Sequence, residues 1–245
     1  MPLCHERKLH MKTPNPILPG RSAGITLLEV VVIIFVVVVL AGIFPFVVSS
    51  ANKKGRMHDS FLMARSLGTA FKMYAGDNDG RFPFARLDGT PLGPSDFSNR
   101  ALENIMPMYS TTKKIFINKT SAWCRNPAVD KSADSYVLKR GQNDWNCVVG
   151  LTEKNPPHWP LFMTATISAT DLTYTNDTDA KGGVWGGTHA VIVYVDGSAR
   201  VEPCDGSVNV AGKTKTFPKR PDTGTSIFTA TPAWLGPGTF ILAPE

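Results

Sequence analysis

Hydrophobic positions are distributed very unevenly along the chain. The run from Val30 to Val48 contains no charged side chain, and its first ten residues, to Val39, are all Val, Ile or Phe. As a helix it would be about 28 Å long, close to the thickness of a bilayer core. Such β-branched residues favour a strand in water, but a lone strand in lipid leaves its backbone groups unpaired. We therefore predict a membrane-spanning helix, with a kink or an unwound turn at Pro45.

An amphipathic stripe continues this helix beyond the apolar run. Apolar residues recur every three or four positions, which places them on one face. The turn-rich sequence at 76–80 (GDNDG) then ends the pattern. We predict one helix from about Ile25 to Tyr74, and its second half should pack under a globular domain through a stripe of six residues. These residues are Met57, Phe61, Ala64, Leu67, Phe71 and Tyr74.

The middle of the chain favours irregular structure. Residues 84–188 are rich in proline, glycine and aromatic residues, and helical spacing recurs only at 101–106. Short apolar runs at 114–117, 136–138 and 159–163 are typical of strands between loops.

The clearest local signal is a hairpin near the end of the chain. The apolar run at 189–195 is followed by Asp196-Gly197 and a second strand at 198–202. Asp-Gly favours a two-residue type I′ turn. In that register Tyr194 faces Ala199 and Ile192 faces Val201 on the side that covers the helix. On the wetter side, Val193 would face Arg200, Val191 would face Glu202, and His189 would lie opposite Cys204.

Together these patterns predict an α+β fold. It consists of a long N-terminal hydrophobic helix packed against a C-terminal domain, with a small antiparallel β-sheet and long irregular loops. The 245 residues are enough for a sizeable core without disulfides. Four cysteines without CxxC spacing exclude a disulfide scaffold and a zinc ribbon.

Charge adds one feature, a basic stretch ahead of the helix. Residues 1–24 carry four basic residues and one acidic residue, so they contribute +3 of the net charge of +6. The remaining +3 is too weak to predict nucleic-acid binding. Three interpretations of the N-terminal region stay open. It could be a secretory signal cut before Ala51, a plain single-span anchor, or a leader that is cut before the helix.

The third interpretation rests on the sequence at 24–29 (GITLLE). It resembles the processing site of type IV prepilins and type II secretion pseudopilins. The segments at 74–83, 121–124 and 135–137 resemble a pseudopilin subgroup with large globular domains. The histidine, apolar strand and Asp-Gly turn near the C-terminus resemble a signature of prepilin-like proteins.

This resemblance implies a role for several residues. Residues 1–24 would be a cleaved leader, 25–75 a retained helix and 76–245 a globular domain. Cleavage would separate Gly24 from Ile25, and the new amine of Ile25 would pair with Glu29 of a neighbouring subunit. The other residues implied in assembly are Thr26, Gly42 and Pro45. The family most often has phenylalanine where this chain has Ile25, which puts methylation of the amine in doubt, and its proline usually lies one position later.

The resemblance also implies partners and a location. The chain would be a homo-oligomeric subunit of a helical filament, a type II secretion pseudopilin. Its partners would be a prepilin peptidase, an inner-membrane assembly platform and other pseudopilins. Before assembly it would cross the bacterial inner membrane once, with the globular domain in the periplasm, or outside the cell in a surface pilus. The alternatives are a minor pilin or adhesin, a DNA-uptake subunit, and a membrane-anchored or secreted binding protein.

Two further features remain hypotheses. Major pseudopilins carry calcium in a C-terminal acidic loop, which makes Asp171, Asp177 and Asp179 candidate ligands. A disulfide between Cys124 and Cys147 would suit an oxidising compartment. Asp77 and Asp79 also suggest calcium, although they lack the other ligands of an EF-hand loop, and helix termination is the simpler interpretation.

Catalysis is not expected. His158 and His189 are the only histidines beyond the predicted helix, and no common catalytic motif accompanies them. A metal at His189 and Cys204 would need more ligands than these two. No cofactor apart from calcium is predicted.

Overall fold

The computed structural model describes residues 24–109, 113–118, 120–124, 136–170, 172–204, 214–215 and 234–245. It describes residues 43–51, 107 and 214–215 by their backbone alone. The chain forms two compact units, Met1–Val48 and Ser49–Glu245. Most of the predicted leader therefore lies outside the described residues.

The longest element is α1 (Leu27–Asp77), whose second part belongs to the unit Ser49–Glu245. It begins two residues after the predicted start and ends three residues after the predicted end. α1 continues through Pro45, so of the two expectations, a kink or an unwound turn, the unwound turn is wrong. At the C-terminal end, the Gly80 N–H donates to Ala75 O at 2.8 Å, and the Asn78 side-chain amide donates to Tyr74 O. These bonds satisfy carbonyl groups that the last helical turn leaves without partners.

The membrane-spanning helix is the main correction to the sequence analysis. Within the part of the chain that the structure describes, no helix combines the length and the apolar character needed to cross a membrane. The predicted fold class, with its long hydrophobic membrane helix, is therefore wrong, and the same finding contradicts the single-pass inner-membrane location.

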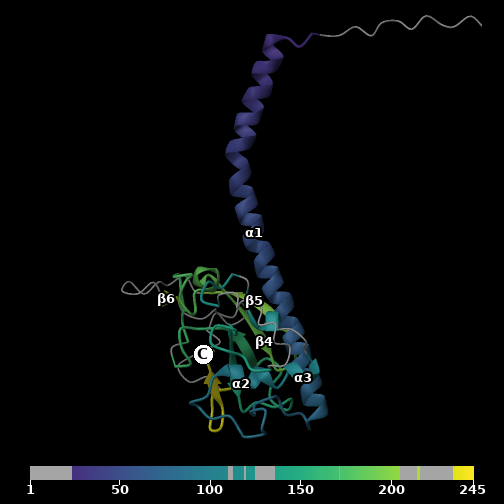
Figure 1. Ribbon diagram of the computed structural model, residues 1–245, viewed down its shortest axis with the longest axis vertical. Coiled ribbons are helices and arrows are strands. Elements are labelled where there is room, and N and C mark those ends of the chain that lie inside the picture. The colour runs from purple at the N-terminus through teal and green to yellow at the C-terminus, as the bar shows by residue number, and fades with distance from the viewer. Residues whose placement is uncertain are drawn as a thin grey trace, which may run out of the picture. The chain divides into compact units, whose positions relative to one another are not determined.

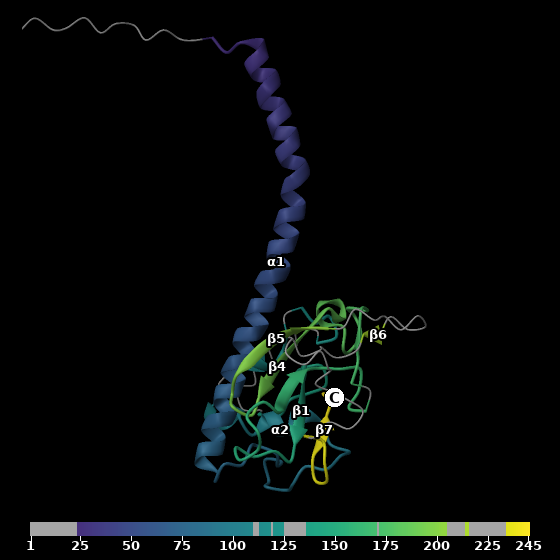
Figure 2. The same ribbon diagram turned by 180° about the vertical axis from the view of Figure 1, so that it is seen from behind.

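A five-stranded antiparallel sheet forms the centre of the second unit (Figures 1 and 2). Its strand order is β5-β4-β2-β1-β7. The strands are β1 (Trp145–Val149), β2 (Pro160–Thr164), β4 (His189–Tyr194), β5 (Ala199–Pro203) and β7 (Phe240–Leu242).

Smaller elements surround this sheet. A separate pair joins β3 (Tyr174–Thr175) to β6 (Thr214–Lys215). Two short α-helices and two 3-10 helices complete the described elements. They are α2 (Ser98–Glu103), α3 (Met106–Tyr109), η1 (Lys113–Phe116) and η2 (Val184–Gly187).

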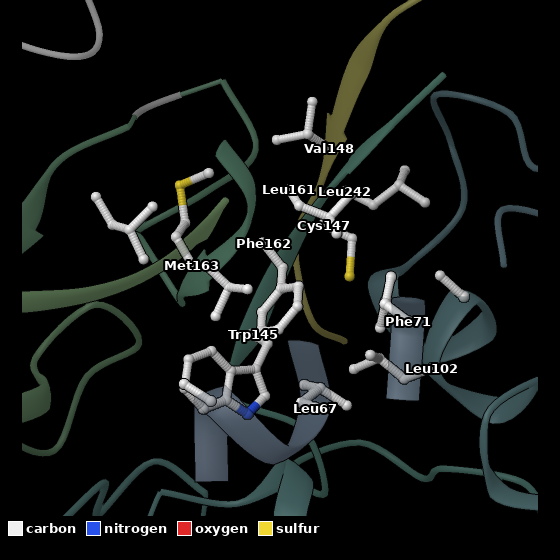
Figure 3. Close-up of a cluster of buried hydrophobic side chains, with 14 of the residues drawn as sticks. Leu67, Phe71, Leu102, Trp145, Cys147, Val148, Leu161, Phe162, Met163 and Leu242 are labelled. Carbon is white, nitrogen blue, oxygen red and sulfur yellow. The ribbon is translucent and has the colours of Figure 1, made fainter. Parts of the chain in front are cut away.

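The core joins the second part of α1 to one face of the sheet. Leu67 and Phe71 from α1 lie near Phe162 and Trp145, with Leu102 from α2 beside them (Figure 3). The Phe71 and Phe162 ring centroids are 5.0 Å apart, and Trp145 meets Phe162 edge-on at 5.7 Å. The predicted stripe is confirmed at its centre, where Ala64, Leu67 and Phe71 are fully buried. At its two ends Met57, Phe61 and Tyr74 are only partly buried.

The hairpin exists, but its predicted register is wrong by one residue. Val193 pairs with Ala199 and Val191 with Val201, so His189 faces Pro203 instead of Cys204. The loop has three residues, because the Gly197 N–H donates to Tyr194 O and the Tyr194 N–H donates to Ser198 O. Only Gly197 has a positive φ in this turn, +81°, as in a type I turn closed by a bulge glycine. The side chains of β4 therefore point to the opposite faces from those predicted: Val193, expected on the wetter side, points toward α1.

Two other predicted strands are absent. Residues 113–116 form the 3-10 helix η1, and 136–138 have no regular structure. The predicted strand at 159–163 corresponds to β2. Short apolar runs do not distinguish a strand from a turn of helix by periodicity, and that explains these errors.

Gly68 allows the close contact between α1 and the hairpin. A Cβ at Gly68 would lie 2.9 Å from Val193 Cγ1 and 3.0 Å from Gly197 O. We expect Gly68→Ala to lower the free energy of unfolding by about 1–3 kcal/mol, because backbone and a buried side chain must move. The measurement is urea unfolding followed by tryptophan fluorescence.

Gly55→Ala is the matched control, since Gly55 lies in the same helix with open space around it. It should raise the free energy of unfolding by about 0.5–1 kcal/mol through helix propensity. Equal effects of the two substitutions would contradict the close contact at Gly68.

Candidate functional site

The sequence at 24–29 builds the start of α1. Thr26 immediately precedes the helix, and its side-chain oxygen accepts the Glu29 N–H at 3.3 Å. Its carbonyl oxygen accepts the Val30 N–H at 3.2 Å, the first bond of the helical pattern. Thr-x-x-Glu is the spacing of a capping box, in which the N-cap side chain satisfies an N–H group of the first turn. The motif therefore has a local structural role of its own.

Glu29 lies in this first turn and is exposed. A carboxylate there is favoured by the partial positive charge at the N-terminus of a helix. Among the residues that the structure describes, Glu29 takes part in no salt bridge. Gly24 and Ile25 precede the helix and are also exposed. Gly24, Ile25, Thr26 and Glu29 thus lie together at one exposed helix end.

Exposed apolar side chains follow directly. Every residue from Val30 to Leu40 is apolar and exposed, between 42% at Val39 and 67% at Phe35. Eleven consecutive residues make about three turns, so the apolar surface extends around the whole helix. A soluble helix normally has a polar face, whereas a helix that is apolar on all sides is normally buried against other elements. This surface is therefore a candidate for contact with another molecule.

The remaining predicted assembly residues lie further along α1. Gly42 has open space where a side chain would project. Pro45 lies within the helix. Both are more than about 20 Å along the helix axis from its first residue, at 1.5 Å per residue. The structure therefore does not bring them together with Thr26 and Glu29.

The acidic positions show turn chemistry. Asp177 and Asp179 are exposed, and Asp177 Oδ1 accepts the Asp179 N–H at 3.0 Å, as in an Asx turn. Asp171 lies outside the described residues. Asp77 accepts a hydrogen bond from the Tyr109 hydroxyl. Over the described ranges, no three His, Cys, Asp or Glu side chains are grouped so that they could hold a metal ion.

The predicted disulfide is not formed. Cys124 and Cys147 are both free and buried. The Cys124 thiol donates to Asn143 O at 3.0 Å, whereas Cys147 lies in the middle of β1, paired with Phe162 and Leu242. Burial raises the pKa of both thiols, which keeps them protonated and unreactive.

Sequence reasoning missed a buried polar cluster at the start of β1. Asp144 is 1% exposed, and Asn143 and Ser121 beside it are also buried. The polar sequence at 142–144 is typical of an exposed loop, so its burial could not be predicted from residue type. The one feature that pointed to burial was the apolar sequence that follows it directly.

The comparisons with known proteins add no family. No protein-family model matches the chain, and no curated protein or solved structure matches it.

The cap at Thr26 can be tested directly. Thr26→Ala removes the oxygen that accepts the Glu29 N–H, which should cost about 1 kcal/mol at the helix start. Amide hydrogen exchange at Glu29 and Val30 should therefore quicken about fivefold. Thr26→Ser retains the oxygen and should exchange like the natural chain. If the alanine and serine variants exchange at the same rate, Thr26 is not a cap.

Proposed function

We propose that the chain is a structural subunit of a type IV pilin-like filament, assembled after cleavage between Gly24 and Ile25. The observation that carries this function is the exposed, all-round apolar surface from Val30 to Leu40, which follows Glu29 at the start of α1. The resemblance of 24–29 to prepilin processing sites supports it, and type II secretion pseudopilins are the form of subunit that it favours.

The apolar surface supplies the driving force in this assembly. Burying one Val, Ile, Leu or Phe side chain contributes about 1.5–3 kcal/mol. A bundle of identical helices would bury many of the eleven exposed side chains at once. A contact repeated between copies without closing into a ring produces an open helical filament. This arrangement does not depend on a membrane-spanning state.

Glu29 would set the register between copies. Cleavage after Gly24 creates an amine on Ile25 that is cationic near neutral pH. In the bundle, the Glu29 carboxylate of one subunit pairs with the Ile25 amine of the next. Removing one partner would leave a buried charge uncompensated, at a cost of about 3–5 kcal/mol. The role of the chain is mechanical, and no reaction is assigned to it.

A charge placed on the apolar surface tests this assembly. Val36 is 46% exposed, so Val36→Lys is accommodated in an isolated molecule but buries an unpaired ammonium in a bundle. In sedimentation velocity and negative-stain microscopy of the full chain, co-produced with a prepilin peptidase, we expect filaments from the natural chain. The Val36→Lys variant should remain small.

Asn52→Lys is the control, because Asn52 is an exposed polar residue of the same helix. It should assemble like the natural chain. The thermal unfolding of the unit Ser49–Glu245 should be unchanged in the Val36→Lys variant, since Val36 lies outside that unit. A natural chain that stays monomeric after processing, or a lysine at 36 that leaves assembly intact, would contradict the proposed function.

A further inference from the structure

A buried carboxyl group lies at the entrance to the central strand of the sheet. Asp144 directly precedes β1 and is 1% exposed. Its backbone is held on both sides, because its N–H donates to Phe116 O at 2.9 Å and its carbonyl accepts the Ala165 N–H at 2.8 Å. The side chain therefore cannot reach water unless one of these neighbouring segments moves.

The Asp144 side chain lacks the partners that a carboxylate requires. Neither carboxyl oxygen has a hydrogen-bond partner of good geometry among the described residues. The Ser121 hydroxyl and the Cys124 thiol are its polar neighbours. The thiol donates instead to Asn143 O at 3.0 Å, and Ser121 Oγ accepts the Cys124 N–H at 3.2 Å. The segment 120–124 thus packs on Asp144 without supplying a compensating charge.

The titratable groups around Asp144 further disfavour a negative charge on its carboxyl group. Cys124, from the packed segment, and Tyr174, from β3, both interact electrostatically with Asp144, and both become negative on losing a proton. Lys181 is a cation that interacts with Cys124, but its ammonium donates to Pro244 O at 2.9 Å and lies over the Trp123 ring. Burial raises the pKa of Asp144 well above its ordinary range.

We propose that the segment 120–124 stays packed on the start of β1 only while the buried Asp144 carboxyl is neutral, and that loss of its proton to solvent opens the contact and exposes the Cys124 thiol. The two pieces of geometry behind this are the 1% exposure of Asp144 and the absence, among the described residues, of a hydrogen bond of good geometry to its carboxyl oxygens. The contact lies wholly within the unit Ser49–Glu245 and does not rest on filament assembly.

The direction in which pH changes the opening follows from the raised pKa of Asp144 in the closed form. In the open form, Asp144 in water ionises near pH 4. In the closed form it stays neutral to a higher pH. Closure is therefore fully favoured below about pH 4, and the ratio of open to closed molecules rises up to tenfold per pH unit above it, until the closed form also ionises.

Thiol labelling followed by peptide mapping measures this opening in the full chain. Cys147 is an internal control, because it is also free and buried, and burial raises the pKa of its thiol without help from a neighbouring charge. Labelling rates between pH 6 and 9 are corrected for thiol ionisation with the unfolded chain. We expect the corrected Cys124 rate to rise with pH, up to tenfold per unit, while Cys147 remains flat.

Asp144→Asn is the matched variant, since it keeps the shape and removes the ionisation. Its corrected Cys124 rate should not change with pH. Amide exchange at Cys124, whose N–H donates to Ser121 Oγ within the segment, reports the same opening in the natural chain even if the variant does not fold, once it is corrected for its intrinsic pH dependence. The proposal is overturned if Cys124 and Cys147 respond alike to pH, if the asparagine variant keeps the rise, or if the Cys124 amide shows no pH-dependent opening.

Discussion

The close approach of α1 to the sheet governs the structure of the unit Ser49–Glu245. Gly68 brings the helix backbone against Val193 and the turn at Gly197, and Phe71 reaches Phe162 in the neighbouring strand. Gly197 in turn lies against the stem of Lys72, since a Cβ there would be 3.0 Å from Lys72 Cγ. The turn geometry and the helix position are therefore coupled, because a hairpin in another register would present different side chains to Gly68.

α1 carries two apolar surfaces with different surroundings. Around Ala64, Leu67 and Phe71 the apolar face is narrow and is covered by the sheet and α2, as expected for a helix on a globular core. Between Val30 and Leu40 the apolar surface surrounds the helix and is exposed. The first surface accounts for the stability of the globular unit. The second has no role within the chain in the described structure, and the filament function gives it one.

The sequence predicted the long helix within three residues at each end, because the apolar run, the periodic spacing and the turn sequence at 76–80 are local signals. It also located the hairpin, but Asp196-Gly197 fits both a two-residue and a three-residue loop, and tertiary contact at Gly68 decides between them. β1 was missed because it follows a polar segment whose burial depends on residues far away in sequence. The predicted disulfide is also wrong, because the position of Cys124 relative to Cys147 depends on tertiary packing that their spacing in the sequence does not determine. At the candidate site, local pattern identified the start of α1 but could not identify the environment of Asp144.

The mass of the N-terminal peptide, measured on chain from cells that also produce a prepilin peptidase, shows whether the apolar surface is kept. A chain that begins at Ile25, with or without one methyl group, keeps the exposed apolar surface and carries the amine that pairs with Glu29. We expect this N-terminus, because filament assembly requires both features. A chain that begins at Ala51 has discarded the surface from Val30 to Leu40, and this result would contradict a filament built on it.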